Sequence, residues 1–251
     1  MQTPQLSFSF TRLFVGRRQF ETTGSYVYMP NSRAVPVTVT IAHTSPAIDS
    51  LSTTTLIIPA NTNYLYFSFA GLTVGSDTLT ATAPGYLPTT AIITVTTQKL
   101  VTSGPPASAL TTTPPSTVTV YTTDSLGSVH SSLDTIALNA VSSNVAVIQP
   151  TAPVSHLLRG AYYVQPLVSY TGPGTASMTY SDSAGRYAPV TTNSVTVTGP
   201  SLSISNSTTM LGMRQNGGVN SAYVYLSNPV TVTPLVVNLL STDTTVVTAT
   251  F

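Results

Sequence analysis

The amino-acid sequence predicts an all-β fold of tandem β-sandwich modules, two of them complete and followed by about half of a third. The segment Gly75–Pro88 (GSDTLTATAPGYLP) returns as Gly174–Pro189 (GTASMTYSDSAGRYAP) 99 residues later, and a fixed internal period is typical of modular arrays. No segment of ten or more residues has the 3.6-residue apolar period of a helix, whereas many short runs alternate. Threonine makes up roughly a fifth of the chain, and β-branched side chains fit a pleated sheet.

The period also predicts where the modules begin and end. The opening segment Leu6–Pro30 returns as Leu202–Ser227, with an offset of 196 at Leu6 and two periods of about 98. We expect residue 1 to lie at a module junction with further sequence upstream, and Phe251 to fall inside a module. The expected modules are residues 1–98, 99–199 and 200–251, joined by short linkers at Thr97–Thr102 and Thr198–Ser201.

In the first module, four runs have an apolar residue at every second position over the length of a strand. They are Val35–Ile41, Tyr64–Phe69, Thr78–Ala83 and Ala91–Thr96. Turn signals separate them, among them Pro59–Asn61, Gly71, Gly75 and Pro84–Gly85. Roughly seven short strands per 100 residues, with turns every 8–12 residues, is the pattern of a β-sandwich.

In the second module, the same alternation predicts five further strands. They are Thr117–Thr122, Asp134–Val141, Tyr162–Tyr170, Ala176–Ser181 and Ser194–Thr198. The module also carries a stretch rich in proline and threonine, Gly104–Ser116 (GPPASALTTTPPS). We expect this insert to be an extended surface loop.

The partial third module offers strands at Leu202–Ser205, Ala222–Leu226 and Leu235–Leu240, and a type I′ turn at Asn216-Gly217. It lacks the counterpart of Leu56–Val95, so it holds about half of a sandwich. Either the third module is truncated, which we favour, or strands of a neighbouring subunit complete it by strand addition.

Composition excludes several classes of function. Charged residues are 6% of the chain, with eight Lys and Arg against seven Asp and Glu, so there is no basic surface for nucleic acid. Hydrophobic residues at 41% with a net charge of +1 disfavour disorder. Cysteine is absent, which excludes disulfides and thiolate chemistry. No apolar run is long enough to span a membrane as a helix.

The run Ser45–Thr96 resembles a bacterial immunoglobulin-like domain of the cell-surface and adhesin type. The matching features are the SPA stretch at Ser45–Ala47, the IPAN turn, the LTVGSDTLTATA hairpin and the PGY turn. The second module keeps the SSN stretch, the PGTASMTYS hairpin and the AGRY turn, and the third keeps STD at Ser241–Asp243. The resemblance implies tandem immunoglobulin-like sandwiches, which serve as stalks, adhesins, filament subunits and enzyme appendages.

The sequence predicts no enzyme, cofactor or metal site. His43, His130 and His156 show no ligand spacing to one another or to a carboxylate pair, and the third module has Ser241 where the first has His43. The seven acidic residues are scattered, with no calcium-loop pattern and no cluster at either linker. No nucleophile elbow follows the pattern G-x-S-x-G.

Two features recur between modules and are candidate site residues. Tyrosine pairs at i and i+2 project from one face of a strand; these are Tyr26 and Tyr28, Tyr64 and Tyr66, and Tyr223 and Tyr225. They either form an aromatic platform for a glycan or a partner protein, or stabilise a weakly charged sheet by cross-strand packing, which we favour.

The second recurring feature is an arginine, because Arg18 and Arg214 hold the same place in GRRQ and GMRQ. We expect each of them to be a structural anchor whose guanidinium donates to loop carbonyls within its own module.

We therefore expect a non-enzymatic structural or adhesive segment of an extracellular bacterial surface protein, acting as a stalk, adhesin or filament module. Its expected partners are adjoining modules or other copies of the same protein, and a surface glycan or protein. The alternatives are a carbohydrate- or protein-binding module that uses the tyrosine faces, and an accessory array of an enzyme outside this sequence.

Overall fold

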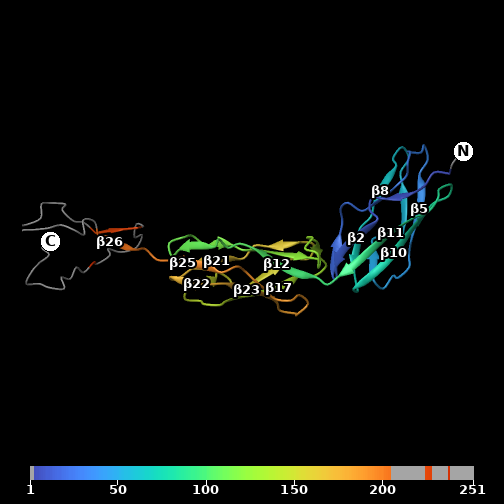
Figure 1. Ribbon diagram of the computed structural model, residues 1–251. Coiled ribbons are helices and arrows are strands. Elements are labelled where there is room, and N and C mark those ends of the chain that lie inside the picture. Colours follow the sequence, from blue (N-terminus) through green and yellow to red (C-terminus); the bar gives the residue numbers. More distant parts are fainter. Residues whose placement is uncertain (1–2, 205–223, 228–236, 238–251) are drawn as a thin grey trace, which may run out of the picture. The chain divides into compact units, whose positions relative to one another are not determined.

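A computed structural model describes residues 3–204, 224–227 and 237 (Figure 1). Within them every regular element is a β-strand and none is a helix, so the all-β prediction is confirmed there. It follows that no helix of the described part could cross a membrane. The chain divides into two compact units, Met1–Thr198 and Gly199–Phe251, and the first of these contains two separate hydrophobic cores.

The first core lies between two sheets whose strands alternate between inward apolar and outward polar residues. One sheet has the order β2-β11-β10-β5-β7: β2 (Arg12–Gly16), β11 (Thr89–Thr96), β10 (Gly75–Thr82), β5 (Val37–His43) and β7 (Thr55–Ile58). The facing layer has two short sheets. The first is β1 (Ser7–Phe8), β4 (Tyr26–Tyr28) and β8 (Tyr64–Tyr66). The second contains β3 (Gln19–Glu21), β9 (Phe69–Gly71) and β6 (Asp49–Leu51).

Side chains from both layers meet in the first core. Leu79 of β10 and Ile93 of β11 are fully buried, and they face Val27 of β4 and Phe69 of β9 from the opposite layer. Fully burying one such side chain stabilises the fold by roughly 1.5–3 kcal/mol. Because inward and outward residues alternate with a period of two, the sequence pattern located these strands to within a few residues.

The second core lies in a sandwich whose strands pair in the same way. One layer contains β19 (Val154–Leu157), β17 (Ile136–Ser142), β23 (Met178–Asp182) and β24 (Val190–Thr191), continued by β22 (Gly174–Ala176), β25 (Val195–Thr198) and β13 (Ser108–Leu110). The other contains β12 (Lys99–Ser103), β15 (Thr119–Thr123) and β20 (Tyr163–Val164), and then β14 (Ser116–Thr117), β21 (Leu167–Tyr170) and β18 (Ile148–Pro150).

Two expectations for the second module are wrong. The segment Gly104–Ser116 is not simply a surface loop, because Ser108–Leu110 forms β13, which pairs in parallel with β25 as β2 pairs with β11. Ala109 packs against the second core, so this segment supplies an edge strand of the sandwich. The linker Thr97–Thr102 is also shorter than expected, because β12 begins at Lys99 and leaves two residues between the last strand of one sandwich and the first strand of the next.

Matching ladder registers place corresponding residues at the same points of the two sandwiches. Leu79 pairs with His43 in the first, and Met178 pairs with Ser142 in the second. Likewise Asp49 pairs with Gly71, and Ile148 pairs with Tyr170. These pairs allow one sandwich to serve as an internal comparison for the other.

In the second unit, β26 (Leu202–Ile204) pairs antiparallel with β27 (Val224–Leu226). Ser203 lies opposite Tyr225, as Ser7 lies opposite Tyr28 in the first sandwich. The expected turn at Asn216-Gly217 and the expected strand Leu235–Leu240, apart from Val237, lie outside the described residues. The choice between a truncated and a complemented third module therefore stays a prediction.

Candidate functional site

The four tyrosines of the first module lie together on the outer face of the β4–β8 pair. Tyr26 lies opposite Tyr66 and Tyr28 opposite Tyr64, while Val27 between them points into the core. The ring centroids of Tyr26 and Tyr66 are 5.3 Å apart, and those of Tyr64 and Tyr66 are 5.5 Å apart with the rings nearly perpendicular. Such edge-to-face pairs are favourable beyond the area that they bury.

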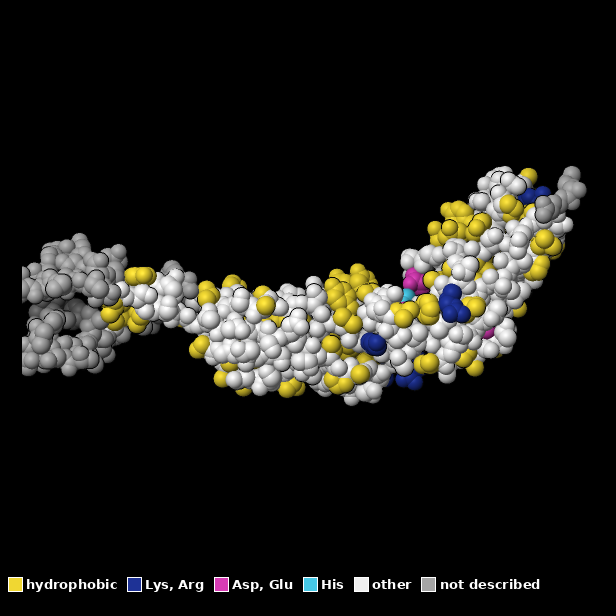
Figure 2. Space-filling view, viewed as in Figure 1, with side chains coloured by type: hydrophobic (Ala, Val, Ile, Leu, Met, Phe, Trp, Pro, Cys, Tyr) yellow, Lys and Arg dark blue, Asp and Glu magenta, His cyan; other side chains and the backbone are white. Residues whose placement is uncertain are grey.

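This tyrosine cluster remains open to solvent. Tyr66 is 53% exposed and Tyr64 46% exposed, and a yellow patch covers the surface over β8 (Figure 2). A shallow hollow of about 270 Å³ lies beside it, lined by Ser9, Tyr26, Tyr28, Asn63 and Tyr64. The rings pack across the two strands, as expected for cross-strand stabilisation. They also present aromatic surface to solvent, as expected for a binding platform. Tyr223 lies outside the described residues.

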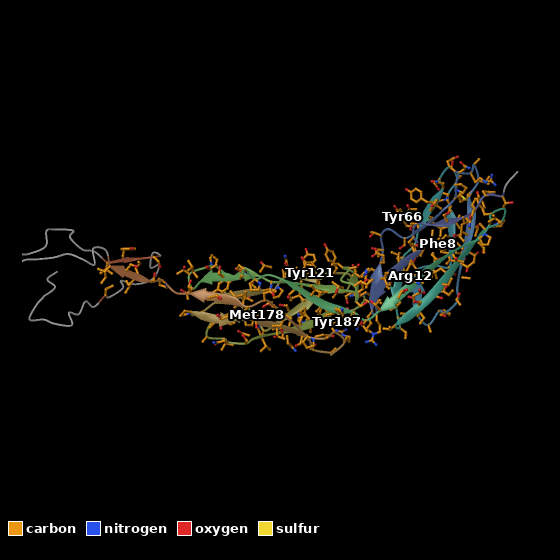
Figure 3. All side chains as sticks on the ribbon, viewed as in Figure 1. Phe8, Arg12, Tyr66, Tyr121, Met178 and Tyr187 are labelled. Carbon is orange, nitrogen blue, oxygen red and sulfur yellow. The ribbon has the colours of Figure 1, made fainter. Side chains whose placement is uncertain are left out.

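A second aromatic group, which contains no i, i+2 pair, occupies the corresponding place in the second sandwich. Tyr121 of β15 lies opposite Tyr163 of β20, as Tyr28 lies opposite Tyr64. Tyr162 packs on Tyr163 with ring centroids 4.9 Å apart, and both are at least 40% exposed. Tyr66 and Tyr121 mark the two groups in Figure 3. Alignment of the strand registers would have found this group, because the tyrosines come from different strands.

Arg18 links the two sandwiches and does not bond loop carbonyls of its own module, so that expectation is wrong. Its Nε and Nη2 atoms donate to the two carboxylate oxygens of Asp134 at 2.5 and 2.6 Å. A carboxylate matches the fork of guanidinium donors better than single carbonyls do. The Arg18 guanidinium lowers the pKa of the Asp134 carboxyl group. Arg214 lies outside the described residues.

Backbone pairing and buried polar groups also cross this junction. Strand β16 (Ser131–Ser132) belongs to the second module by sequence, yet it pairs with β3 and extends the sheet to the order β16-β3-β9-β6. The side chain of Gln19 is fully buried, accepts from Gly16 N–H and donates to the carbonyl of Thr123. Acidic residues that are scattered along the sequence also meet at this junction, namely Asp134 beside Arg18, and Glu21 and Asp124 beside His130.

His130 occupies this junction between two carboxylates. Its Nδ1 lies 3.3 Å from Glu21 Oε2 and its Nε2 lies 3.4 Å from Asp124 Oδ2. His130 is 8% exposed, so its imidazole is buried between these two side chains. The hydrogen bond with His130 lowers the pKa of Glu21, against the effect of burial. His156, in contrast, is exposed in β19.

The third histidine, His43, lies against a buried pair of carboxylates in the first sandwich. Its Nδ1 is 2.8 Å from Asp77 Oδ2 and 3.0 Å from Asp49 Oδ1. The sequence shows no ligand spacing between His43 and a pair of carboxylates, but the fold brings such a pair to it. The three residues are 6 and 28 positions apart along the chain. They meet because β5 and β10 are neighbours in one sheet and β6 lies in the facing layer. They are the one group in the described residues whose donor atoms are close enough to hold a metal ion. Burial and the charge of Asp77 raise the pKa of Asp49 to about 6.

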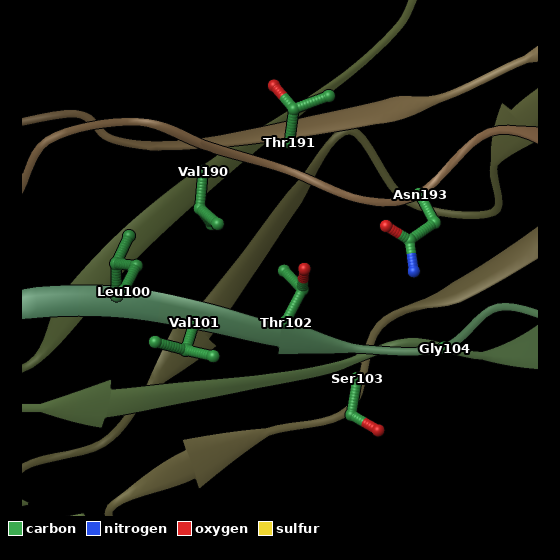
Figure 4. Close-up of a pocket in the computed structure, with 8 residues that line it drawn as sticks. All are labelled: Leu100, Val101, Thr102, Ser103, Gly104, Val190, Thr191 and Asn193. Atoms are coloured by element: carbon green, nitrogen blue, oxygen red, sulfur yellow. The ribbon is translucent and has the colours of Figure 1, made fainter. Parts of the chain in front are cut away.

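A hollow of about 420 Å³ lies in the second sandwich beside the edge strands β12 and β24 (Figure 4). Val101, Ser103, Thr191 and Asn193 are among its lining residues. These supply aliphatic, hydroxyl and amide groups, and none of the lining residues titrates near neutral pH. The lining therefore offers no general acid or base.

No protein-family model matches the sequence, and no curated protein matches it. The chain is similar to a solved segment of intimin, with 11% identity and a TM-score of 0.37 over 78% of this chain and 99% of that one. It is similar to the Yersinia pseudotuberculosis adhesin InvE with 14% identity and a TM-score of 0.33, over 78% of this chain and 58% of that one. It is also similar to domains 5–6 of the S-layer protein SbsC, with 14% identity and a TM-score of 0.32 over 77% of this chain and 98% of that one. TM-scores of this size describe a loose similarity and identify no function.

Proposed function

We propose that the chain is a non-enzymatic structural or adhesive segment of an extracellular, cell-surface protein, in the role of a stalk, adhesin or filament module. The observation that carries this proposal is the junction between the two sandwiches. A spacer has to transmit force or hold a distance, so its modules must be joined by more than a flexible linker.

The junction meets that requirement in three ways. Two residues separate the strands of the two sandwiches, the β3–β16 pair makes one sheet continuous across them, and the bidentate pair of Arg18 and Asp134 lies beside that sheet. Buried hydrogen bonds such as that of Gln19 to Thr123 are costly to break, because each leaves a desolvated polar group. Adjoining modules or other copies of the same protein are the partners that such a segment would have.

The test of the structural role is nitrogen-15 relaxation on the whole chain. If the two sandwiches form one rigid spacer, their amides have the same rotational correlation time. The variant Gln19→Ala is expected to separate the two values, while Gln165→Ala, which removes an exposed amide away from the junction, leaves them equal. Independent tumbling of the sandwiches in the unaltered chain would contradict the proposal. Labelling of intact source cells with an antibody tests the surface location.

A second candidate function is favoured by the tyrosine groups. Exposed aromatic rings at corresponding places in two sandwiches provide repeated flat surfaces for stacking on sugar rings or on a partner protein. Binding to an array of glycans and matrix proteins tests this, with Tyr64→Ser plus Tyr66→Ser as the variant. Val35→Ser, which also removes a well-exposed apolar side chain from the same module, is the control. A ligand bound equally by the tyrosine variant and the control would exclude this surface.

A further inference from the structure

Three side chains that carry possible metal-ligand atoms, those of His43, Asp49 and Asp77, meet beneath the surface of the first sandwich. His43 ends β5, Asp77 lies in β10 beside it, and Asp49 begins β6 in the opposite layer. The side chains of both aspartates are 0% exposed and that of His43 is 11% exposed. The group therefore joins the two layers of the sandwich, with the imidazole on the side nearest to solvent.

Hydrogen bonds satisfy the carboxylate oxygens of this group only in part. Asp77 is held by the chain, because its Oδ1 accepts from the backbone N–H groups of Thr44 and Ser45 at 3.0 and 2.6 Å. Its Oδ2 faces His43 Nδ1. Asp49 has no hydrogen-bond donor for either oxygen. Its Oδ1 is 3.0 Å from Nδ1, but the single proton that Nδ1 can carry is directed to the nearer Asp77.

A buried carboxylate without a donor is costly, so the fold alone does not account for it. The second sandwich confirms that the architecture does not need these groups. The ladder registers place Ser142 and Ile148 at the positions of His43 and Asp49. Ala176 lies two residues before Met178, as Asp77 lies two residues before Leu79, so it holds the third position. Ile148 and Ala176 are buried there without any charge. All three ligand positions change together between the two sandwiches, as expected for residues that act as one site.

We propose that His43, Asp49 and Asp77 bind a divalent transition-metal cation of the Zn²⁺ or Mn²⁺ type. One imidazole nitrogen and two carboxylate oxygens suit these metals, whereas Ca²⁺ takes six to eight oxygen ligands. Bonds of about 2.0–2.2 Å place adjacent ligand atoms about 2.8–3.1 Å apart in octahedral coordination, and about 3.3–3.6 Å apart in the tetrahedral coordination that Zn²⁺ favours. The separations of Nδ1 from the two oxygens, 2.8 and 3.0 Å, lie in the octahedral range and within about 0.5 Å of the tetrahedral one.

Binding requires Nδ1 to lose its proton, since a ligating imidazole is neutral. The cation then takes the place of that proton, supplies Asp49 with a partner and offsets the charge of both carboxylates. Because its ligands come from β5, β6 and β10, the bound cation cross-links the two layers of the first sandwich. Its role is to stabilise this module in a metal-containing medium.

The experiment is a titration of the whole chain, freed of metal by a chelator, with Zn²⁺ and separately with Mn²⁺. We expect one equivalent to bind, and the thermal transition of the first sandwich to rise by about 10–20 °C at a hundredfold excess over Kd. The titration is followed by the NMR signals of the three imidazoles. The signals of His43 should shift, and those of His130 and His156 in the same molecule, which should not shift, are the internal controls. If neither metal shifts the His43 signals, or if the signals of all three histidines shift alike, the site is wrong.

The matched variant carries the residues of the second sandwich, His43→Ser with Asp49→Ile and Asp77→Ala. We expect it to lose the single equivalent and the thermal shift. The isosteric variant Asp49→Asn, which keeps the volume of the side chain, should weaken binding at least tenfold and serves as the reference if the triple variant does not fold. Unchanged binding by Asp49→Asn would overturn the proposal.

Discussion

Asp49→Asn should make the metal-free protein more stable at neutral pH, and the gain should disappear in acid. The side chain is fully buried with no hydrogen-bond donor. Burial and the neighbouring charge of Asp77 raise its pKa from 3.8 to about 6. A carboxyl group with a higher pKa in the folded state holds its proton more tightly when folded. Its contribution to stability is therefore present below pH 4 and is lost as the pH rises from about 4 to about 6.

The size of this effect follows from the two pKa values. The difference between 3.8 and about 6 corresponds to about 3 kcal/mol once the pH exceeds both. Asparagine has nearly the same shape and never ionises, so the variant avoids this cost. We expect a gain of about 3 kcal/mol at pH 7 and about 0.5 kcal/mol at pH 4.

The assay is urea unfolding of the chelator-treated chain at the two pH values, followed through resolved amide signals of the first sandwich. The signals of the second sandwich report any general effect of pH or urea in the same sample. An equal gain at pH 4 and pH 7 would refute the argument, because the benefit would then not come from ionisation. A loss of stability at pH 7 would also refute it, and would mean that the carboxylate makes a favourable contact.

Three further outcomes test the packing and the junction. Leu79→Ala should cost about 2–5 kcal/mol of unfolding free energy, because Leu79 is fully buried, whereas Ile57→Ala at a position 59% exposed should change it by less than about 0.5 kcal/mol. Gly71→Ala should destabilise the first sandwich by about 1–3 kcal/mol, since the added Cβ would lie 2.7 Å from a backbone carbonyl oxygen; an unchanged urea midpoint would contradict this. A double-mutant cycle of Arg18→Ala and Asp134→Ala should give a coupling of about 0.5–1 kcal/mol, reduced by 1 M salt, because the Arg18 side chain is 46% exposed.

The regular parts of the fold could be predicted because alternation reports directly on a sheet with one buried face. Thr78–Ala83 and Ala91–Thr96 have long, uninterrupted alternation, and they correspond to β10 and β11 with small shifts at their ends. The strand at Ser108–Leu110 could not be predicted in this way. It is three residues long and pairs on one side, and it lies among prolines that are typical of loops.

The candidate sites required information that periodicity does not contain. His43 and Asp77 meet because β5 and β10 are neighbours in the sheet, and Asp49 reaches them from the other layer. The junction is harder still, since Arg18 and Asp134 are 116 residues apart. Recurrence between modules identified Arg18 as a residue of interest, but it predicted the wrong partner. Asp134 belongs to a different module, and comparing like positions of the repeats does not reveal contacts between modules.

The β3–β16 pairing has a consequence for how the protein is made. The ladder partners Phe20 and Ser131 are 111 residues apart, so the sheet edge at β3 stays uncovered until synthesis has passed well into the second module. At about 5–20 residues per second, the 35 residues between Thr96 and Ser131 take about 2–7 s to emerge. During that interval the nascent first sandwich presents an open strand edge, the kind of surface on which neighbouring chains pair. The arrival of Ser131–Ser132, during synthesis or export, therefore ends the interval in which each new molecule is vulnerable to self-association.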